Sequence, residues 1–209
     1  MLYSEIKTNF ASILNRRDLT PSQTNMFLQF SIQRIQRNLR VPAMEALVTL
    51  VTDGTPNLTI PGDFLEGIAL YTDDTINQEK FSKLDLQRVI RESNIPGVPF
   101  CYCRVGPKWL IGHVPPAGTN IYCSYYQDAS ALSADSDHNW LTDLAPDLFI
   151  YGALVRAADF FLDERKDMFE QTFQQCLADL QDMADRDELE NASVGMACAT
   201  GQVDYGWYY

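Results

Sequence analysis

Apolar side chains recur every three or four residues at both ends of the chain, a spacing typical of amphipathic helices. A first helix is predicted from about residue 3 to residue 15, and its apolar face comprises Ile6, Phe10, Ile13 and Leu14. A second helix starts after Thr20, which can accept hydrogen bonds from free backbone N–H groups while Gln23 completes a capping box. Because Pro42 cannot continue a helix, this one should end near Arg40.

The pattern changes between about residues 45 and 128, where β-branched and aromatic residues form short runs separated by Gly and Pro turns. The runs that predict strands are 46–52, 58–60, 68–72, 100–105, 109–114 and 120–127. Residues 79–92 fit a short helix between them. The middle of the chain therefore predicts a small antiparallel sheet inserted between helical parts.

From residue 139 onward the helical spacing returns and continues to about residue 190. A polar stretch at 163–167 interrupts it, and although no Gly or Pro forces a break there, we favour two helices over one. The predicted fold class is α+β. It comprises a helical bundle from 1–42 and 139–190, a β-rich subdomain from 45–128, and an extended C-terminal arm from 192–209.

Charge is distributed unevenly along the chain. The net charge is −12, yet residues 1–40 carry a net +4 and the remainder −16. This asymmetry indicates that one end meets an acidic surface, while the acidic remainder repels DNA and argues against bulk nucleic-acid binding. No apolar run approaches membrane-spanning length and no signal peptide is recognisable, so we expect folding in a cytoplasm without a membrane partner.

Motifs of catalysis and cofactor binding are not recognisable in this sequence, which predicts a protein that is not an enzyme and binds no cofactor. Cys101, Cys103 and Cys123 could suggest a metal site with His113, but zinc-ligand spacing is missing and unpaired cysteines are usually small buried apolar residues. We therefore predict no metal site and reduced thiols.

Two groups of acidic residues allow a functional and a structural interpretation. Asp135, Asp137 and His138 could bind a divalent cation, although a loop with helix-capping residues explains them better. Residues 159–190 carry eleven Asp and Glu, which fit a solvated helix face or a lining that repels DNA.

Arginines and aromatic residues supply the candidate binding residues. Arg34, Arg37 and Arg40 lie three apart on nearly one helix face; they either end a solvated helix or contact an acidic neighbouring subunit or partner. The last residues of the chain contain four aromatic side chains, at Tyr205, Trp207, Tyr208 and Tyr209. Because such side chains are normally buried against a partner, we predict that they form a docking arm.

Several segments, taken in order, resemble the head-to-tail adaptor (connector) proteins of tailed phages, especially short-tailed ones. The segments that carry the resemblance are 58–66 with its Pro-Gly-Asp-Phe turn, 114–116, the tyrosine-rich 121–126, 132–133, 139–141, 146–154 with Pro-Asp-Leu and Tyr-Gly-Ala-Leu, 157–158 and 163–164. The resemblance covers roughly residues 1–190. Its motifs are moderately specific as a set and weak individually.

The resemblance implies a virion protein of the phage neck that assembles in the host cytoplasm. Such proteins form a homo-oligomeric ring, commonly a dodecamer, which binds the portal protein after DNA packaging. The ring extends the channel through which DNA passes without sequence-specific binding, and it presents a docking surface for tail or nozzle proteins. Relatives often bind the portal through a C-terminal extension, which suits Tyr205 to Tyr209, although no motif aligns there.

Two other classes of protein remain as alternatives. A virion-associated cell-wall hydrolase would need a cleft with paired carboxylates, and no pair here has recognisable spacing. A soluble cytoplasmic binding module would act as a monomer or dimer and would not need residues 192–209.

Overall fold

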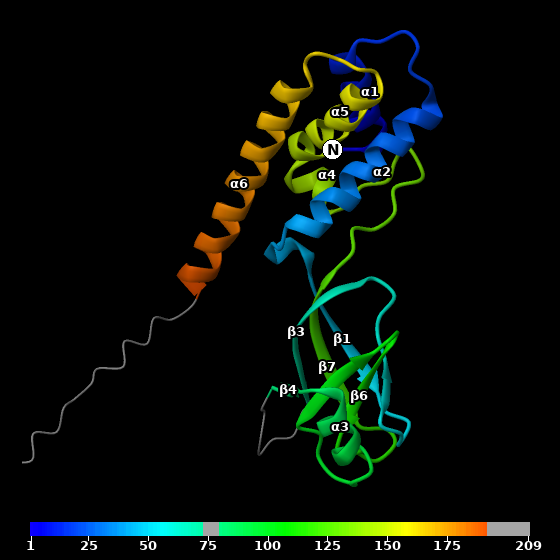
Figure 1. The fold of residues 1–209 in the computed structure, drawn as a ribbon, viewed down its shortest axis with the longest axis vertical. Coiled ribbons are helices and arrows are strands. Elements are labelled where there is room, and N and C mark those ends of the chain that lie inside the picture. The colour runs from blue at the N-terminus through cyan, green and yellow to red at the C-terminus, as the bar shows by residue number, and fades with distance from the viewer. Residues whose placement is uncertain (73–79, 192–209) are drawn as a thin grey trace, which may run out of the picture.

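The chain forms two lobes stacked along its longest axis, seen in a computed structural model that describes residues 1–72 and 80–191 (Figure 1). The helical lobe contains α1 (Tyr3–Leu14), α2 (Pro21–Asn38), α4 (Trp140–Leu144), α5 (Pro146–Phe160) and α6 (Lys166–Asn191). The β lobe contains β1 (Glu45–Val51), β2 (Asn57–Thr59), β3 (Phe64–Thr72), β4 (Ser82–Lys83), α3 (Leu86–Glu92), β5 (Cys101–Val105), β6 (Lys108–Gly112) and β7 (Asn120–Gln127). The predicted α+β fold class is confirmed. The residue boundaries of the predicted domains stay a prediction.

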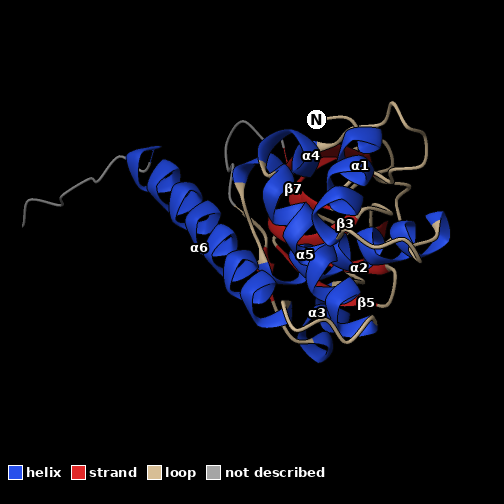
Figure 2. Ribbon diagram, turned by 90° about the horizontal axis from the view of Figure 1, so that it is seen from above, coloured by secondary structure: helices blue, strands red, loops and turns tan. Residues whose placement is uncertain are grey.

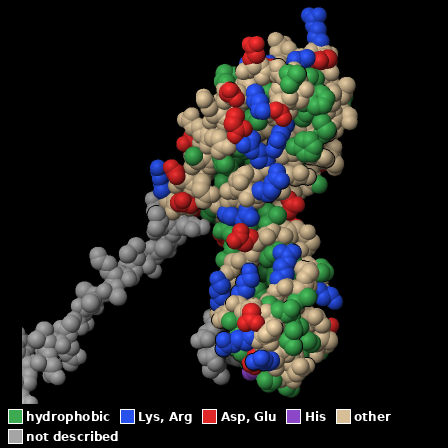
Figure 3. Space-filling view, in the orientation of Figure 1, with side chains coloured by type: hydrophobic (Ala, Val, Ile, Leu, Met, Phe, Trp, Pro, Cys, Tyr) green, Lys and Arg blue, Asp and Glu red, His purple; other side chains and the backbone are tan. Residues whose placement is uncertain are grey.

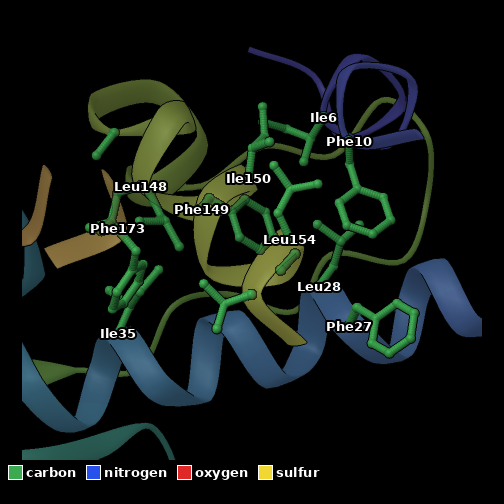
Figure 4. Packing of buried hydrophobic residues seen from close by; sticks show 14 of the residues in the cluster. Ile6, Phe10, Phe27, Leu28, Ile35, Leu148, Phe149, Ile150, Leu154 and Phe173 are labelled. Carbon is green, nitrogen blue, oxygen red and sulfur yellow. The ribbon is translucent and has the colours of Figure 1, made fainter. Parts of the chain in front are cut away.

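Helix α5 is the centre of the helical lobe, and α1, α2 and α6 pack around it. Its apolar residues surround the helix instead of forming one stripe, which is typical of a buried helix. Side chains from all four helices converge on this core, including Phe10 of α1, Leu28 of α2, Phe149 of α5 and Phe173 of α6 (Figure 4). Seen from above, α6 lies at the outside of the bundle and extends beyond it (Figure 2).

Gly152 allows three helices to meet closely within this core. A Cβ atom at this position would lie 2.3 Å from Ser31 Oγ of α2 and 3.0 Å from a ring carbon of Phe173 of α6. The Ser31 hydroxyl donates a buried hydrogen bond of 2.8 Å to the Phe149 carbonyl, which fixes α2 against α5. The glycine of the Tyr-Gly-Ala-Leu segment therefore has a packing role: a side chain there would push α2 and α6 away from α5.

The ends of the helices follow the local sequence. The predicted capping box of α2 is present, because Gln23 N–H donates to Thr20 Oγ and the Gln23 side chain accepts from Thr20 N–H. The predicted break after α5 is also present. Leu162 adopts a left-handed backbone with φ of 54°, and Asp163 accepts hydrogen bonds from the side chain and the backbone of Arg165. The region 139–190 holds three helices, since α4 precedes α5 as a separate short helix.

Two sheets pack face to face in the β lobe. The first sheet has the order β1-β7-β3 and is antiparallel. The second has the order β2-β6-β5-β4, in which β4 runs parallel to β5. Alternate residues of β7, such as Ile121 and Cys123, face Trp109 and Ile111 of β6 across the interior. The structure thus divides the single antiparallel sheet that we expected into two.

The short helix α3 covers the other face of the second sheet. Val89 of α3 packs against Cys101 and Cys103, which project from the same side of β5 because they are two residues apart. The predicted short helix at 79–92 is confined to Leu86–Glu92 and is capped by Asp85, which accepts from Arg88 N–H.

The chain crosses between the lobes twice, at the narrow waist visible in Figure 3. It enters the β lobe through Glu45 and leaves through Gln127, at the same end of the paired strands β1 and β7. Met44 is fully buried in the helical core, and Gln36 of α2 donates a hydrogen bond to Asp128. Both crossings are therefore attached to the helical lobe.

Candidate assembly surfaces

The three candidate arginines occupy different environments, and only Arg34 and Arg37 lie on α2, because the helix ends at Asn38, before Arg40. Arg34 lies over the Phe173 ring and donates to Glu170 of α6 at 2.8 Å. Arg40 donates to Glu66 of β3 at 2.8 Å and to backbone carbonyls at the end of α2. Arg37 is exposed and forms no ion pair with another described residue. A contact with another subunit or with the portal stays a prediction for all three, and Arg37 has the side chain most available for it.

Arg37 lines a groove of about 440 Å³ between α2 and α5, which we call the α2–α5 groove. The residues that line it are Met26, Phe27, Phe30, Gln33, Arg37, Arg156, Asp159 and Phe160. Phe30 and Phe160 are 43% and 56% exposed. Figure 3 shows Lys and Arg side chains gathered over this part of the helical lobe. The groove combines exposed aromatic rings with cationic groups, a composition enriched in protein–protein interfaces.

The outward face of α6 points away from the bundle and is largely polar. This face comprises the exposed residues Met168, Gln171, Gln175, Asp179, Asp182 and Arg186. Asp179 and Asp182 form no ion pair with other described residues. Up to Asp187, the acidic side chains of α6 are therefore exposed, as predicted for a solvated face, except where Glu170 turns inward to Arg34.

Exposed apolar side chains gather where α5 turns into α6, at the end of the helical lobe farthest from the β lobe (Figure 1). Phe160, Leu162 and Met168 are 56%, 91% and 53% exposed. The Arg165 guanidinium stabilises this turn by donating to the carbonyls of Ile13 and Leu14 at the end of α1. Its hydrogen bond also lowers the pKa of Asp163 to about 2. An ordered turn that exposes a leucine is suited to binding another protein.

The opposite end of the molecule, around α3, also exposes apolar side chains. These are Leu86 and Ile90 on α3, followed by Ile95, Val98 and Phe100 on the next loop. Val98 lines a hollow of about 440 Å³ together with Pro99, Pro115 and Pro116. The sequence analysis did not identify this surface, although the apolar residues Ile95, Val98 and Phe100, separated by Pro and Gly, were the available signal.

The residues considered for metal binding do not come together. Cys101 and Cys103 face α3, whereas Cys123 lies between the two sheets, where burial raises its pKa to about 11. His113 packs edge-on against Phe100 and lies 3.4 Å from Glu92. Within residues 1–72 and 80–191, no group of three His, Cys, Asp or Glu side chains could hold a metal ion.

The stretch from Asp135 to His138 has the predicted loop geometry. The Asp137 carboxylate accepts from Ser133 N–H and Ala134 N–H, while Asp135 pairs with Lys7 of α1. Asn139 then caps α4 by accepting from Thr142 N–H. These contacts account for the acidic side chains as loop and cap residues. The predicted docking residues Tyr205, Trp207, Tyr208 and Tyr209 lie outside the described residues.

Exposed apolar surfaces thus lie at both ends of the described chain, a feature that favours a protein that binds other proteins. A comparison with protein families agrees, since the family model described as SU10 adaptor protein matches residues 1–196. The chain belongs to this SU10 adaptor protein family and is thus a structural, non-enzymatic phage protein, as predicted. A search of curated proteins found no match.

Family membership places the chain in the virion and implies contact with head and tail components of the phage. It also excludes the alternative that the chain is a virion-associated cell-wall hydrolase. None of the helices in the described ranges is both long and apolar enough to cross a bilayer.

Proposed function

We propose that this adaptor forms a homo-oligomeric ring beneath the portal protein and joins the phage head to tail or nozzle proteins. The ring, a dodecamer by the family resemblance, extends the DNA channel and is assembled in the host cytoplasm. The observation that supports this most is the pair of exposed apolar surfaces at opposite ends of the molecule, at Leu162 and at Val98. A subunit placed between two partners needs one binding surface for each.

The charge of the chain suits the wall of a DNA channel. The net charge of −12 disfavours tight phosphate binding, so DNA passes without being held and without its sequence being read. Acidic side chains such as Asp167 and Asp185 are exposed on α6. A predominantly acidic surface also keeps the free subunits soluble before they bind the portal.

Tyr205, Trp207, Tyr208 and Tyr209 supply the portal contact in this proposal. Large aromatic side chains bury much apolar area for each residue that binding must order, which makes them frequent anchors of interfaces. Four of them within five residues can offset the entropy lost when a chain end is fixed on a partner.

Native mass spectrometry of the full chain, alone and mixed with the cognate portal ring, tests the proposal. We expect the wild type to bind the portal ring with a defined stoichiometry. A variant with serine at Tyr205, Trp207, Tyr208 and Tyr209 should lose this binding. A matched control with serine at Thr200, Gln202, Val203 and Asp204 should keep it. A wild-type chain that remains monomeric and indifferent to the portal would show the proposal to be wrong and favour the cytoplasmic binding module.

A further inference from the structure

We infer that neighbouring copies of this chain bind each other through two different surfaces: the α2–α5 groove of one copy receives the outward face of α6 from the next. The inference rests on the proposed function, because it identifies the two surfaces that a ring of these subunits would join. The partner is a second copy of the chain.

The groove offers two cationic groups, of which Arg156 also interacts with the nearby carboxylates of Asp159 and Glu170. Arg37 is exposed without an ion pair in the described residues, and the buried Nε of Arg156 has no hydrogen-bond partner there. Asp159 also lines the groove, but its carboxylate pairs with Lys166. Phe30 and Phe160 provide apolar area beside these charges. The groove therefore suits a surface that is acidic and partly apolar.

The outward face of α6 has the complementary composition. Met168 is 53% exposed at its first turn and can contact aromatic rings. Gln171 and Gln175 follow with amide groups, Asp179 and Asp182 then present carboxylates at one-turn spacing, and Arg186 beyond them is the one cation of this face. Because the helix lies at the outside of the bundle, this face can reach a neighbour without unfolding anything (Figure 2).

The two surfaces belong to different helices and share no residue, which determines the symmetry of the contact. A contact between unlike surfaces is heterologous, so a docked pair still presents one free groove on one copy and one free α6 face on the other. Further subunits can therefore bind until the last one contacts the first. A ring is the closed product, and a symmetric dimer would instead require one surface to contact its own copy.

Charge reversal on each surface tests the inference. Arg37→Glu makes the groove acidic, whereas the double variant Asp179→Lys/Asp182→Lys makes the α6 face basic. Each variant alone brings like charges together at every interface, and we expect self-association on the portal ring to weaken at least about tenfold. Lys108→Glu on β6, the same charge change at an exposed position away from both surfaces, is the matched control and should assemble as the wild type does.

An equimolar mixture of the two charge-reversed variants provides the decisive measurement. The acidic groove of one variant fits the basic α6 of the other, and the two unaltered surfaces fit each other. We expect native mass spectrometry to detect rings that contain equal numbers of both variants, although each variant alone self-associates at least about tenfold more weakly than the wild type. Thermal unfolding of each variant verifies that it is folded. The inference is wrong if Arg37→Glu assembles like the wild type, or if the folded variants do not assemble when mixed.

These outcomes separate the inference from the proposed function. If the wild type binds the portal and Arg37→Glu self-associates on the portal ring as strongly as the wild type, the inference fails and the proposed function stands. If the wild type ignores the portal but self-associates in solution with the expected charge dependence, the proposed function fails and the inference stands. Both fail if the wild type remains monomeric under both conditions.

Discussion

Gly152 is the position at which packing of the helical lobe can be tested most sharply. Replacing a glycine with alanine inside a helix usually stabilises a protein by about 1 kcal/mol through helix propensity. Here the new methyl group would overlap Ser31 Oγ at 2.3 Å and press on Phe173 at 3.0 Å. Overpacking of this kind costs about 1–3 kcal/mol, and displacing the Ser31 hydroxyl loses a hydrogen bond of roughly 1 kcal/mol. We therefore expect Gly152→Ala to lower the free energy of unfolding by about 1–3 kcal/mol.

Urea denaturation followed by far-ultraviolet circular dichroism measures this change, and a double-mutant cycle with Ser31→Ala identifies its cause. Ser31→Ala removes the closest atom, so Gly152→Ala should cost less in that background, with a coupling energy of about 1 kcal/mol or more. Gly62→Ala is the control, since a Cβ atom there meets nothing within 4 Å. A Gly152→Ala variant as stable as the wild type, or strictly additive effects, would refute the close approach of α2 to α5.

Three further predictions concern the helix ends and the exposed turn. Thr20→Ala should lower the free energy of unfolding, measured by urea denaturation, by about 1 kcal/mol because the capping box of α2 is lost. Thr8→Ala, on the exposed side of α1, should change this free energy little. Equal effects of the two substitutions would contradict the capping role. Because the hydrogen bond from Arg165 lowers the pKa of Asp163 to about 2, this carboxylate stabilises the fold above about pH 4, the unfolded pKa, and ceases to do so as the pH falls toward 2. Asp163→Asn should thus lower the urea midpoint at neutral pH and flatten its decline in acid, and an unchanged pH profile would count against this pair. Leu162→Asn should keep or slightly raise the melting temperature, since asparagine tolerates φ of 54°, while weakening assembly on the portal ring; a destabilised variant would show that Leu162 packs within its own chain.

Local signals predicted the helices and strands well because each is encoded by neighbouring residues. Thr20 and Gln23 define the start of α2, and Pro42 follows its end, without reference to the rest of the chain. The alternation in β7 likewise specifies which of its side chains are buried. The division into two sheets was not predictable in this way, because β2 pairs with β6 about fifty residues later and β4 joins β5 in parallel.

The candidate surfaces were predictable only in part, for the same physical reason. Spacing alone placed Arg34, Arg37 and Arg40 on one face, but it could not show that Glu170 and Glu66 pair with two of them. The groove beside Arg37 depends on how α2 crosses α5, which is a tertiary feature. The docking residues Tyr205 to Tyr209 lie outside the described residues, so their portal contact stays a prediction from sequence and family resemblance.

The two crossings at the waist have a mechanical consequence. Glu45 begins β1 and Tyr126 lies opposite it near the end of β7, so both covalent connections enter the β lobe at one end of a seven-residue antiparallel pair. A pull between head and tail would load these two strands side by side and along their length. Tension would then pass through two peptide backbones in parallel, and no interstrand hydrogen bond would have to break to carry it. Each subunit would thus act as a double tether between the two halves of the particle, one that resists peeling under load.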